Sequence, residues 1–149
     1  MATRLNAEDF WTFSLALYCR PPVATACLSL QDRRGVDVNL ILAICWLATR
    51  GQVAGAEAQA AAIAAVAPWN KAVLKQLREV RRGIDAAFAE VEKTDRQSIK
   101  HGLLSVELEC ERVAQQKILV ALEPLVEAGG GTTPRVLAKA GLALYLQGL

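Results

Sequence analysis

The chain has 149 residues, of which 53% are hydrophobic and 21% are charged, and its formal net charge is +2 at pH 7. This length suits one ordinary domain, and this composition excludes a disordered protein. The longest apolar run, Leu40 to Ala48, is shorter than the roughly 20 residues that cross a bilayer, which excludes a transmembrane protein. Frequent alanine and leucine without strand-like alternation predict an all-α fold.

The N-terminal segment predicts two helices separated by a pair of prolines. Asn6 precedes two acidic residues and an apolar run, so we expect it to cap a helix that ends near Cys19. The prolines end this helix and begin the next, which runs from about Val23 to Arg34 and is closed by Gly35. Acidic residues directly before the apolar run oppose a secretory signal peptide, so we expect a cytoplasmic protein.

The third predicted helix follows the polar segment SLQDRRGVDVN at residues 29 to 39. Asp37 is placed to cap it, Gly51 to end it, and the helix itself covers about 38–50. Because it is apolar on every side, it must be surrounded by protein, and we place it at the centre of the fold. Its cap and the preceding Gly35 explain only part of the polar segment.

An alanine-rich helix follows, which we expect to end at Pro68. Two long helices come next, each with apolar residues at alternating spacings of three and four. The first predicted seam is Val73, Leu77, Val80, Ile84, Ala87 and Val91, and the second is Ile99, Leu103, Val106, Cys110 and Val113. Between them, Thr94 and Gln97 fit a capping box. So short a connection predicts an antiparallel helical hairpin.

The whole pattern predicts a compact all-α protein of about six to seven helices, with a central buried helix and a long antiparallel hairpin. We expect no strand. Residues 1–128 are expected to form a single helical domain. Three glycines then precede Pro134, which opens a last helix to about Gln147. The sequence leaves open whether this Gly-linked segment, 129–149, is docked or mobile.

Four short motifs carry a resemblance to a known family. They are FW-x-FSL-x-LY at 10 to 18, A-C-L-x-L-Q-D at 26 to 32, G-x-D-V-N at 35 to 39 and W-L-A at 46 to 48. Together they resemble a family of short proteobacterial proteins known only as a domain of unknown function, and L-R-x-V-R-R at 77 to 82 is similar to it as well. A glycine commonly stands in that family where this chain has Pro22. The resemblance implies an all-helical cytoplasmic protein and brings no activity, ligand or catalytic residue.

The first candidate site is the polar segment with its aromatic surroundings. Its residues are Trp11, Tyr18, Gln31, Asp32, Asn39 and Trp46. Helical spacing puts Asn39 and Trp46 on one face of the central helix, where an amide could orient a small ligand in an apolar pocket. The alternative is that Asn39 and Asp32 only satisfy backbone groups at neighbouring helix ends, and we favour this alternative.

The second candidate is a row of cations on the first hairpin helix, which we expect to lie opposite the apolar seam. Its residues are Lys71, Lys75, Arg78, Arg81 and Arg82. Such a row can bind an acidic partner, nucleic acid or anionic lipid. The sequence pI near 8.4 lies below the value of about 9 typical of nucleic-acid-binding domains, so nucleic acid is disfavoured. A solvated helix face remains the simplest interpretation.

The remaining chemistry-bearing residues predict no catalytic, cofactor or metal site. Glu107 and Glu111 lie one turn apart, but helical metal sites of this kind need Glu-x-x-His pairs, and His101 is the only histidine. We expect Glu111 instead to meet Gln115. The four cysteines, at positions 19, 27, 45 and 110, lack metal-ligand spacing and are expected to be free packing residues. These absences disfavour an enzyme.

The leading functional hypothesis is a small cytoplasmic helical module for protein–protein interaction, an adaptor whose hairpin docks an unknown protein partner. A binding module, or an enzyme, with an apolar pocket lined by Trp11, Asn39 and Trp46 is the alternative. A polyanion binder acting through residues 71–82 is the third. Homo-oligomerisation and peripheral membrane contact stay open, because an exposed apolar stripe can pair with its copy.

Overall fold

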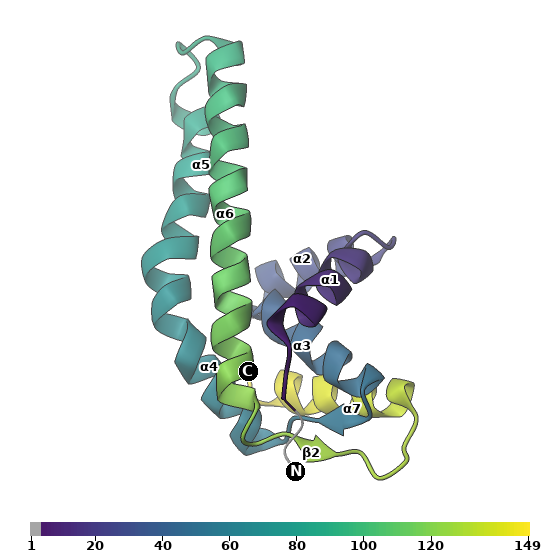
Figure 1. Cartoon of the computed structure of the whole chain (residues 1–149). Coiled ribbons are helices and arrows are strands. Elements are labelled where there is room, and N and C mark those ends of the chain that lie inside the picture. Colours follow the sequence, from purple (N-terminus) through teal and green to yellow (C-terminus); the bar gives the residue numbers. More distant parts are fainter. Residues whose placement is uncertain (1–3) are drawn as a thin grey trace. The chain divides into compact units, whose positions relative to one another are not determined.

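A computed structural model describes residues 4–149 and confirms the predicted all-α class (Figure 1). The described chain divides into two compact units. Unit 1 comprises the chain up to Ala65 together with Gln115–Leu149, and unit 2 comprises Val66–Ala114. The expected boundary at residue 128 stays a prediction.

Unit 1 is built around the predicted central helix. Its helices include α1 (Ala7–Tyr18), α2 (Val23–Arg34), α3 (Val38–Thr49) and α7 (Pro134–Gln147). Helix α3 contacts each of the other three, and nine of its twelve residues are buried. A helix without a polar side therefore lies where helices of its own unit cover it.

The predicted caps fix where the first three helices begin and end. The Asn6 side chain accepts a hydrogen bond from the Asp9 backbone N–H at 3.0 Å. Gly35 closes α2 with a φ of 64°, a left-handed conformation that costs glycine little. Asp37 Oδ1 accepts from the N–H groups of Asn39 and Leu40 at 2.8 and 3.3 Å. Local chemistry alone thus sets these helix ends.

Helix α7 packs on α3 at very short range. A Cβ added to Gly141 would lie 2.6 Å from Ile44 Cγ2, so only glycine lets the two helices approach this closely. The Gly141 carbonyl accepts a hydrogen bond from Gln59 Nε2 at 3.0 Å. Tyr145 Oη accepts another from the Asp37 N–H at 2.7 Å, and Arg34 donates to the Leu146 carbonyl. Backbone, apolar and polar contacts together hold α7 in unit 1.

The expectation of no strand was wrong. Strands β1 (Gln52–Val53) and β2 (Glu127–Ala128) pair antiparallel, and the Gly129 N–H extends the ladder to the Gly51 carbonyl at 2.7 Å. Two residues are too few for any alternation to be visible in the sequence. The pairing arises because the ends of two helical segments meet and need partners for their backbone groups.

The expectation that a helix ends at Pro68 was also wrong. Helix α4 covers Ala56–Trp69 and continues through a π-helical turn, η1 (Asn70–Leu74), into α5 (Lys75–Ala87). Proline lacks the N–H that an α-helix interior requires. The wider turn that follows, in which the Lys75 N–H bonds to the Asn70 carbonyl five residues earlier, lets the chain continue as a helix.

Unit 2 contains the predicted antiparallel hairpin, in which α5 and the first part of α6 (Lys93–Leu122) run side by side (Figure 1). Helix α6 begins at Lys93, so Thr94 lies inside it and the expected capping box does not form the helix end. The connection is short, and boundaries predicted from sequence commonly differ by one or two residues. Among the described residues, no helix is long and apolar enough to span a bilayer.

Candidate interaction surface of the hairpin

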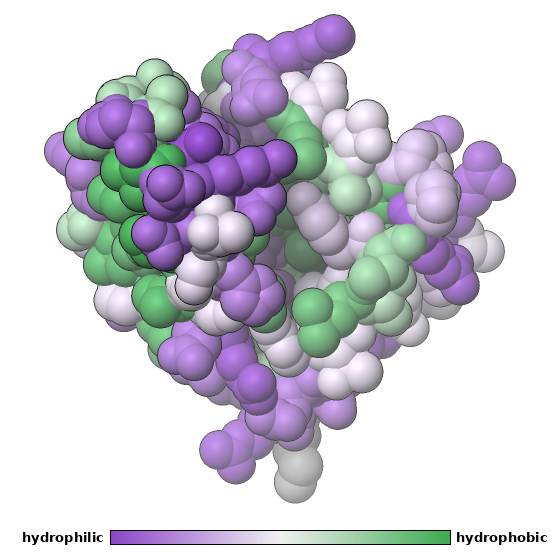
Figure 2. Space-filling view, turned by 90° about the horizontal axis from the view of Figure 1, so that it is seen from above, coloured by the Kyte–Doolittle hydropathy of each residue, from purple (hydrophilic) through white to green (hydrophobic). Residues whose placement is uncertain are grey.

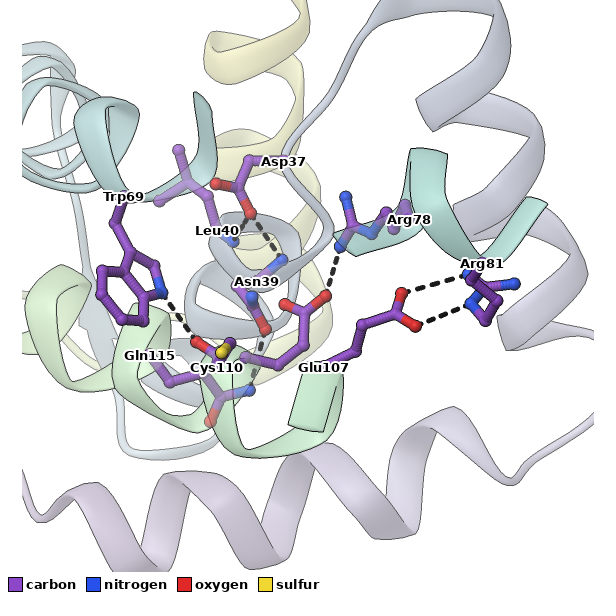
Figure 3. Close-up of polar contacts among 10 residues, drawn as sticks. Asp37, Asn39, Leu40, Trp69, Arg78, Arg81, Glu107, Cys110 and Gln115 are labelled. Carbon is purple, nitrogen blue, oxygen red and sulfur yellow. Dashed lines mark hydrogen bonds and ion pairs between the residues drawn. The ribbon is translucent and has the colours of Figure 1, made fainter. Parts of the chain in front are cut away.

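The two hairpin helices are joined by ion pairs on the sides that face each other (Figure 3). Arg81 Nε donates to Glu107 Oε2 at 2.6 Å, and its Nη2 donates to Oε1 at 3.1 Å. Arg78 pairs with Glu111 one turn along. The hydrogen bonds that Arg81 donates to the buried Glu107 carboxylate raise the pKa of Arg81. A forked guanidinium on a carboxylate fixes both distance and register between the helices.

The same register continues along the hairpin in both directions. Toward the connection, Asp85 accepts from Arg96 Nη1 at 3.2 Å and pairs with Lys100. The hydrogen bond from Lys100, followed by the charge of Arg96, lowers the pKa of Asp85. In the other direction, the Trp69 indole N–H donates to the Cys110 carbonyl at 2.9 Å (Figure 3). Polar contacts thus bind the hairpin along its length.

These contacts correct the expected placement of the second and third candidates. Arg78 and Arg81 belong to the predicted basic row, yet they point toward α6 and pair with the two glutamates at 107 and 111. Glu111 pairs with Arg78, and its expected contact with Gln115 stays a prediction. Lys71, Lys75 and Arg82 are exposed, and polyanion binding through them stays a prediction.

Part of the predicted apolar seams is exposed to solvent. Leu74, outside the predicted seam, is buried to 1% exposure. Four members of the predicted seams are exposed to solvent: Ala87, Val80 at 54%, Ile99 at 51% and Val106 at 47%. The prediction assumed that the apolar rows face each other. Half-buried seam residues such as Leu77, Ile84 and Leu103 share the hairpin with the charged groups that pair between its helices.

We define the outer rows as two triplets with the same spacing of three and four. They are Val80, Gly83 and Ala87 in α5, and Ile99, Gly102 and Val106 in α6.

Each outer row is displaced by one residue from the inward-facing positions, such as Arg81 in α5 and Glu107 in α6. One residue rotates a side chain by about 100° around an α-helix. Because the helices are antiparallel and face each other, the same rotation brings both rows to one side of the hairpin. We call this side the outer face. Figure 2 shows the surface from above, where hydrophobic residues lie among hydrophilic ones.

The first candidate site lies in unit 1, and there its main residues contact protein. The Trp46 ring stacks on Phe10 with centroids 5.2 Å apart, and the Arg50 guanidinium lies 4.9 Å from the ring centre. Asn39 Oδ1 accepts from Gln115 Nε2 at 3.1 Å, and the same amide nitrogen donates to Ser14 Oγ at 3.0 Å. Trp46 and Asn39 are both buried.

The other members of the first candidate are less buried. Trp11, Tyr18 and Gln31 are half-buried, and Asp32 is exposed. Sequence reasoning missed Gln115, the buried partner of Asn39, and Ser14, which accepts a hydrogen bond from the same Gln115 amide. Gln115 lies in line with the buried positions Ala114 and Ile118 of α6, so its place on that face was a usable signal. Its Oε1 atom is buried and has no hydrogen-bond partner in the described chain.

The four cysteines are free thiols in the described chain. Burial raises the pKa of Cys27 and Cys45, and the proximity of Cys27 adds to the shift at Cys45. Burial also raises the pKa of Cys110, with a contribution from neighbouring glutamates. Raised values make these thiols less nucleophilic. Over residues 4–149, no three histidine, cysteine or acidic side chains gather as a metal site would require.

Comparison with known proteins identifies the family. Residues 9–118 match the model of a family described as a protein of unknown function, DUF2390. The chain belongs to the DUF2390 family. The match includes the whole of unit 2 and ends before α7. No curated protein and no solved structure matches the chain.

Proposed function

We propose that the protein is a small cytoplasmic module for protein–protein interaction, in which the outer face of the hairpin docks a helical partner. One observation carries the proposal. The hairpin forms two arginine–glutamate pairs between its helices and leaves Val80, Ile99 and Val106 about half exposed. Apolar rows that their own unit does not cover are typical of protein-binding surfaces. The free cysteines support a reducing compartment.

The docking face would act as an apolar platform two helices wide. A partner helix laid along it would remove both outer rows from water at once, and burial of apolar area is the main source of affinity. The ion pairs between α5 and α6 would keep the platform rigid, so little ordering of the hairpin opposes binding.

Site-specific photocrosslinking in living cells tests this function. A photoreactive amino acid replaces Val106 in the outer face, and the matched control replaces Leu108. Leu108 lies in the same helix and is similarly exposed at 51%, but it points to the opposite side. We expect a defined protein adduct from position 106 and little from position 108. Equal adducts from both positions, or none from 106, would contradict the proposal.

A second candidate function is the binding of a small molecule in unit 1. It is favoured by the buried Gln115 Oε1, an acceptor without a partner beside Asn39 and Ser14. A buried acceptor of this kind is usually satisfied by a water molecule or a ligand. Native mass spectrometry of the gently purified protein tests it. A small mass that is lost on denaturation and absent from Asn39→Ala supports a ligand; protein mass alone opposes it.

A further inference from the structure

We propose that the buried side-chain oxygen of Gln115 anchors a ligand site in unit 1, and that this site takes a neutral hydrogen-bond donor, an O–H or N–H group. This inference rests on the second candidate function and names the class of its ligand. It draws on three properties of the cluster that Gln115 forms with Ser14 and Asn39: its burial, the orientation of the Gln115 amide, and the uncharged chemistry of all three side chains.

Gln115 is almost completely removed from solvent, at 2% exposure. Ser14 and Asn39 are buried beside it, at 4% and 7%. Over residues 4–149, Gln115 Oε1 is the one buried side-chain nitrogen or oxygen without a hydrogen-bond partner. A buried acceptor without a partner loses its hydration and gains nothing in return, so such atoms are rare in native proteins. The folded chain is therefore stabilised by a donor that binds this oxygen.

A second buried glutamine in unit 1 serves as a comparison. Gln59 is 4% exposed, and its Nε2 donates to the carbonyls of Ala54 and Gly141, both at 3.0 Å. In the described chain, Gln59 has no buried side-chain atom that lacks a partner. The two glutamines thus use their N–H groups alike and differ at Oε1. Burial of a glutamine does not by itself leave an acceptor unpaired, so the feature belongs to the Gln115 cluster.

The orientation of the Gln115 amide is set by its two partners. Nε2 donates to Ser14 Oγ at 3.0 Å and to Asn39 Oδ1 at 3.1 Å, which uses both of its hydrogens. Figure 3 shows the amide nitrogen toward Asn39 and the amide oxygen on the other side. Turning the amide over would bring two acceptors, Oε1 and Asn39 Oδ1, together. The position without a chain partner is therefore an acceptor, and a ligand there must donate.

The chemistry of the cluster selects a neutral donor. An anion would place its negative charge against the lone pairs of Gln115 Oε1. A cation would leave water for a hydroxyl and two amides that carry no formal charge, and burial of an unpaired ion is strongly unfavourable. A hydroxyl or a neutral N–H group meets neither penalty. Water is the smallest donor of this class, and an alcohol or an amide is its organic counterpart.

Helix α1 adds aromatic surface beside the cluster. Trp11 precedes Ser14 by three residues and Tyr18 follows it by four, so helical spacing puts all three on one side of α1. Both aromatic residues are half-buried. Aromatic surface around a few polar groups is the usual composition of a small-molecule site, and it suits an organic donor with an apolar body.

A crystal structure at atomic resolution, of the protein purified gently from its own cells, tests the inference. We expect a non-protein donor atom about 2.7–3.2 Å from Gln115 Oε1. Gln115→Met keeps the length of the side chain and removes the amide, so it should lose this density. Gln59→Met removes the other buried amide and is the matched control, which should keep the density. Circular dichroism checks that both variants fold.

The wild-type structure decides the inference even if Gln115→Met does not fold. A donor from the chain itself on Oε1, an anion beside it, or no atom within hydrogen-bond distance would overturn the inference. Gln115→Met that folds and keeps the density would overturn it as well, because the oxygen would then not hold the ligand.

The outcomes separate this inference from the function on which it rests. A single water molecule on Gln115 Oε1 supports the donor site and rejects a small-molecule function. An organic hydroxyl or amide on the same oxygen supports both. If the chain itself satisfies Oε1 while native mass spectrometry still finds a small mass that is lost on denaturation, the function stands at another place and the inference falls.

Discussion

Helix α3 in unit 1 buries nine of its twelve residues, whereas α5 in unit 2 buries none of its thirteen. The two helices differ in what holds them. Around α3, apolar side chains from several helices exclude water, and polar groups such as Asn39 are satisfied inside. Along α5, guanidinium and carboxylate groups make the contacts to α6. One short chain can therefore combine a unit built on a buried apolar core with a hairpin whose two helices are joined by ion pairs.

This contrast also separates stability from function. In unit 1 apolar residues build a buried core, although some large apolar side chains, among them Leu28 and Val120, are exposed there too. In unit 2, ion pairs help to hold α5 against α6, and Val80, Ile99 and Val106 remain exposed to solvent. Exposed apolar area and a rigid backbone are the two properties that an interaction surface requires.

The largest expected effect concerns the core of unit 1. Leu47 is fully buried, and Leu47→Ala should lower the free energy of unfolding by about 2–5 kcal/mol because it leaves a cavity. Urea unfolding followed by circular dichroism measures this loss. Leu15→Ala in α1, at a position 45% exposed, should cost about 0.5 kcal/mol or less. Similar losses for both variants would show that α3 is not the core.

The next effect tests whether charge holds the hairpin. Glu107→Leu leaves Arg81 without its carboxylate, and we expect a loss of about 1–3 kcal/mol in the stability of unit 2. Adding Arg81→Met should recover most of it, since replacing both members of a buried pair with apolar residues is often neutral. Hydrogen exchange of the α5 and α6 amides reports this unit by itself. A double variant no better than the single one would refute the pairing.

A smaller effect is expected where α7 meets α3. The methyl group of Gly141→Ala would lie 2.6 Å from Ile44 Cγ2, and overpacking of this kind costs about 1–3 kcal/mol, less the gain in helix propensity. Ile44→Leu moves the branch methyl away, so the double variant should lose less than Gly141→Ala alone. Faster hydrogen exchange in α7 is the readout. Unchanged exchange in Gly141→Ala would mean that α7 does not depend on this contact.

The smallest effect concerns the exposed carboxylate of Asp85. Its pKa is lowered in the folded hairpin, so its charge stabilises the fold above its ordinary value of 3.8. That contribution is lost as the pH falls through the lower folded-state value. Wild type and Asp85→Asn should therefore differ in hairpin stability at neutral pH and converge in acid. A difference that is constant with pH would show that the pairs with Lys100 and Arg96 contribute nothing.

A comparison of sequence and structure shows which inferences were reachable. The boundaries of α1, α2 and α3 followed from Asn6, Gly35 and Asp37, because capping depends on a few residues near each helix end. The hairpin followed from two periodic segments with a short connection. The inward side of the hairpin did not follow, because periodicity identifies a row of apolar residues without saying what covers it.

Two further features could not be predicted from the sequence. The passage through Pro68 requires a π-helical turn whose bond from Lys75 to Asn70 has no sequence signature of its own. The polar triad of Ser14, Asn39 and Gln115 joins residues up to 101 positions apart. The sequence shows a proline within a helical pattern and polar residues within apolar ones, but only the folded structure shows which groups they contact.

By itself, the sequence determined the all-helical class, the caps of the first three helices, the central place of α3 and the existence of a hairpin. These depend on local hydrogen bonding and on the period of the apolar pattern, which the chain carries along its length. Only the tertiary structure decided that Arg78 and Arg81 face α6 while Val80 and Val106 face outward. The physical reason is that an ion pair between helices needs one residue from each of two segments. The sequence of one segment alone therefore does not specify it.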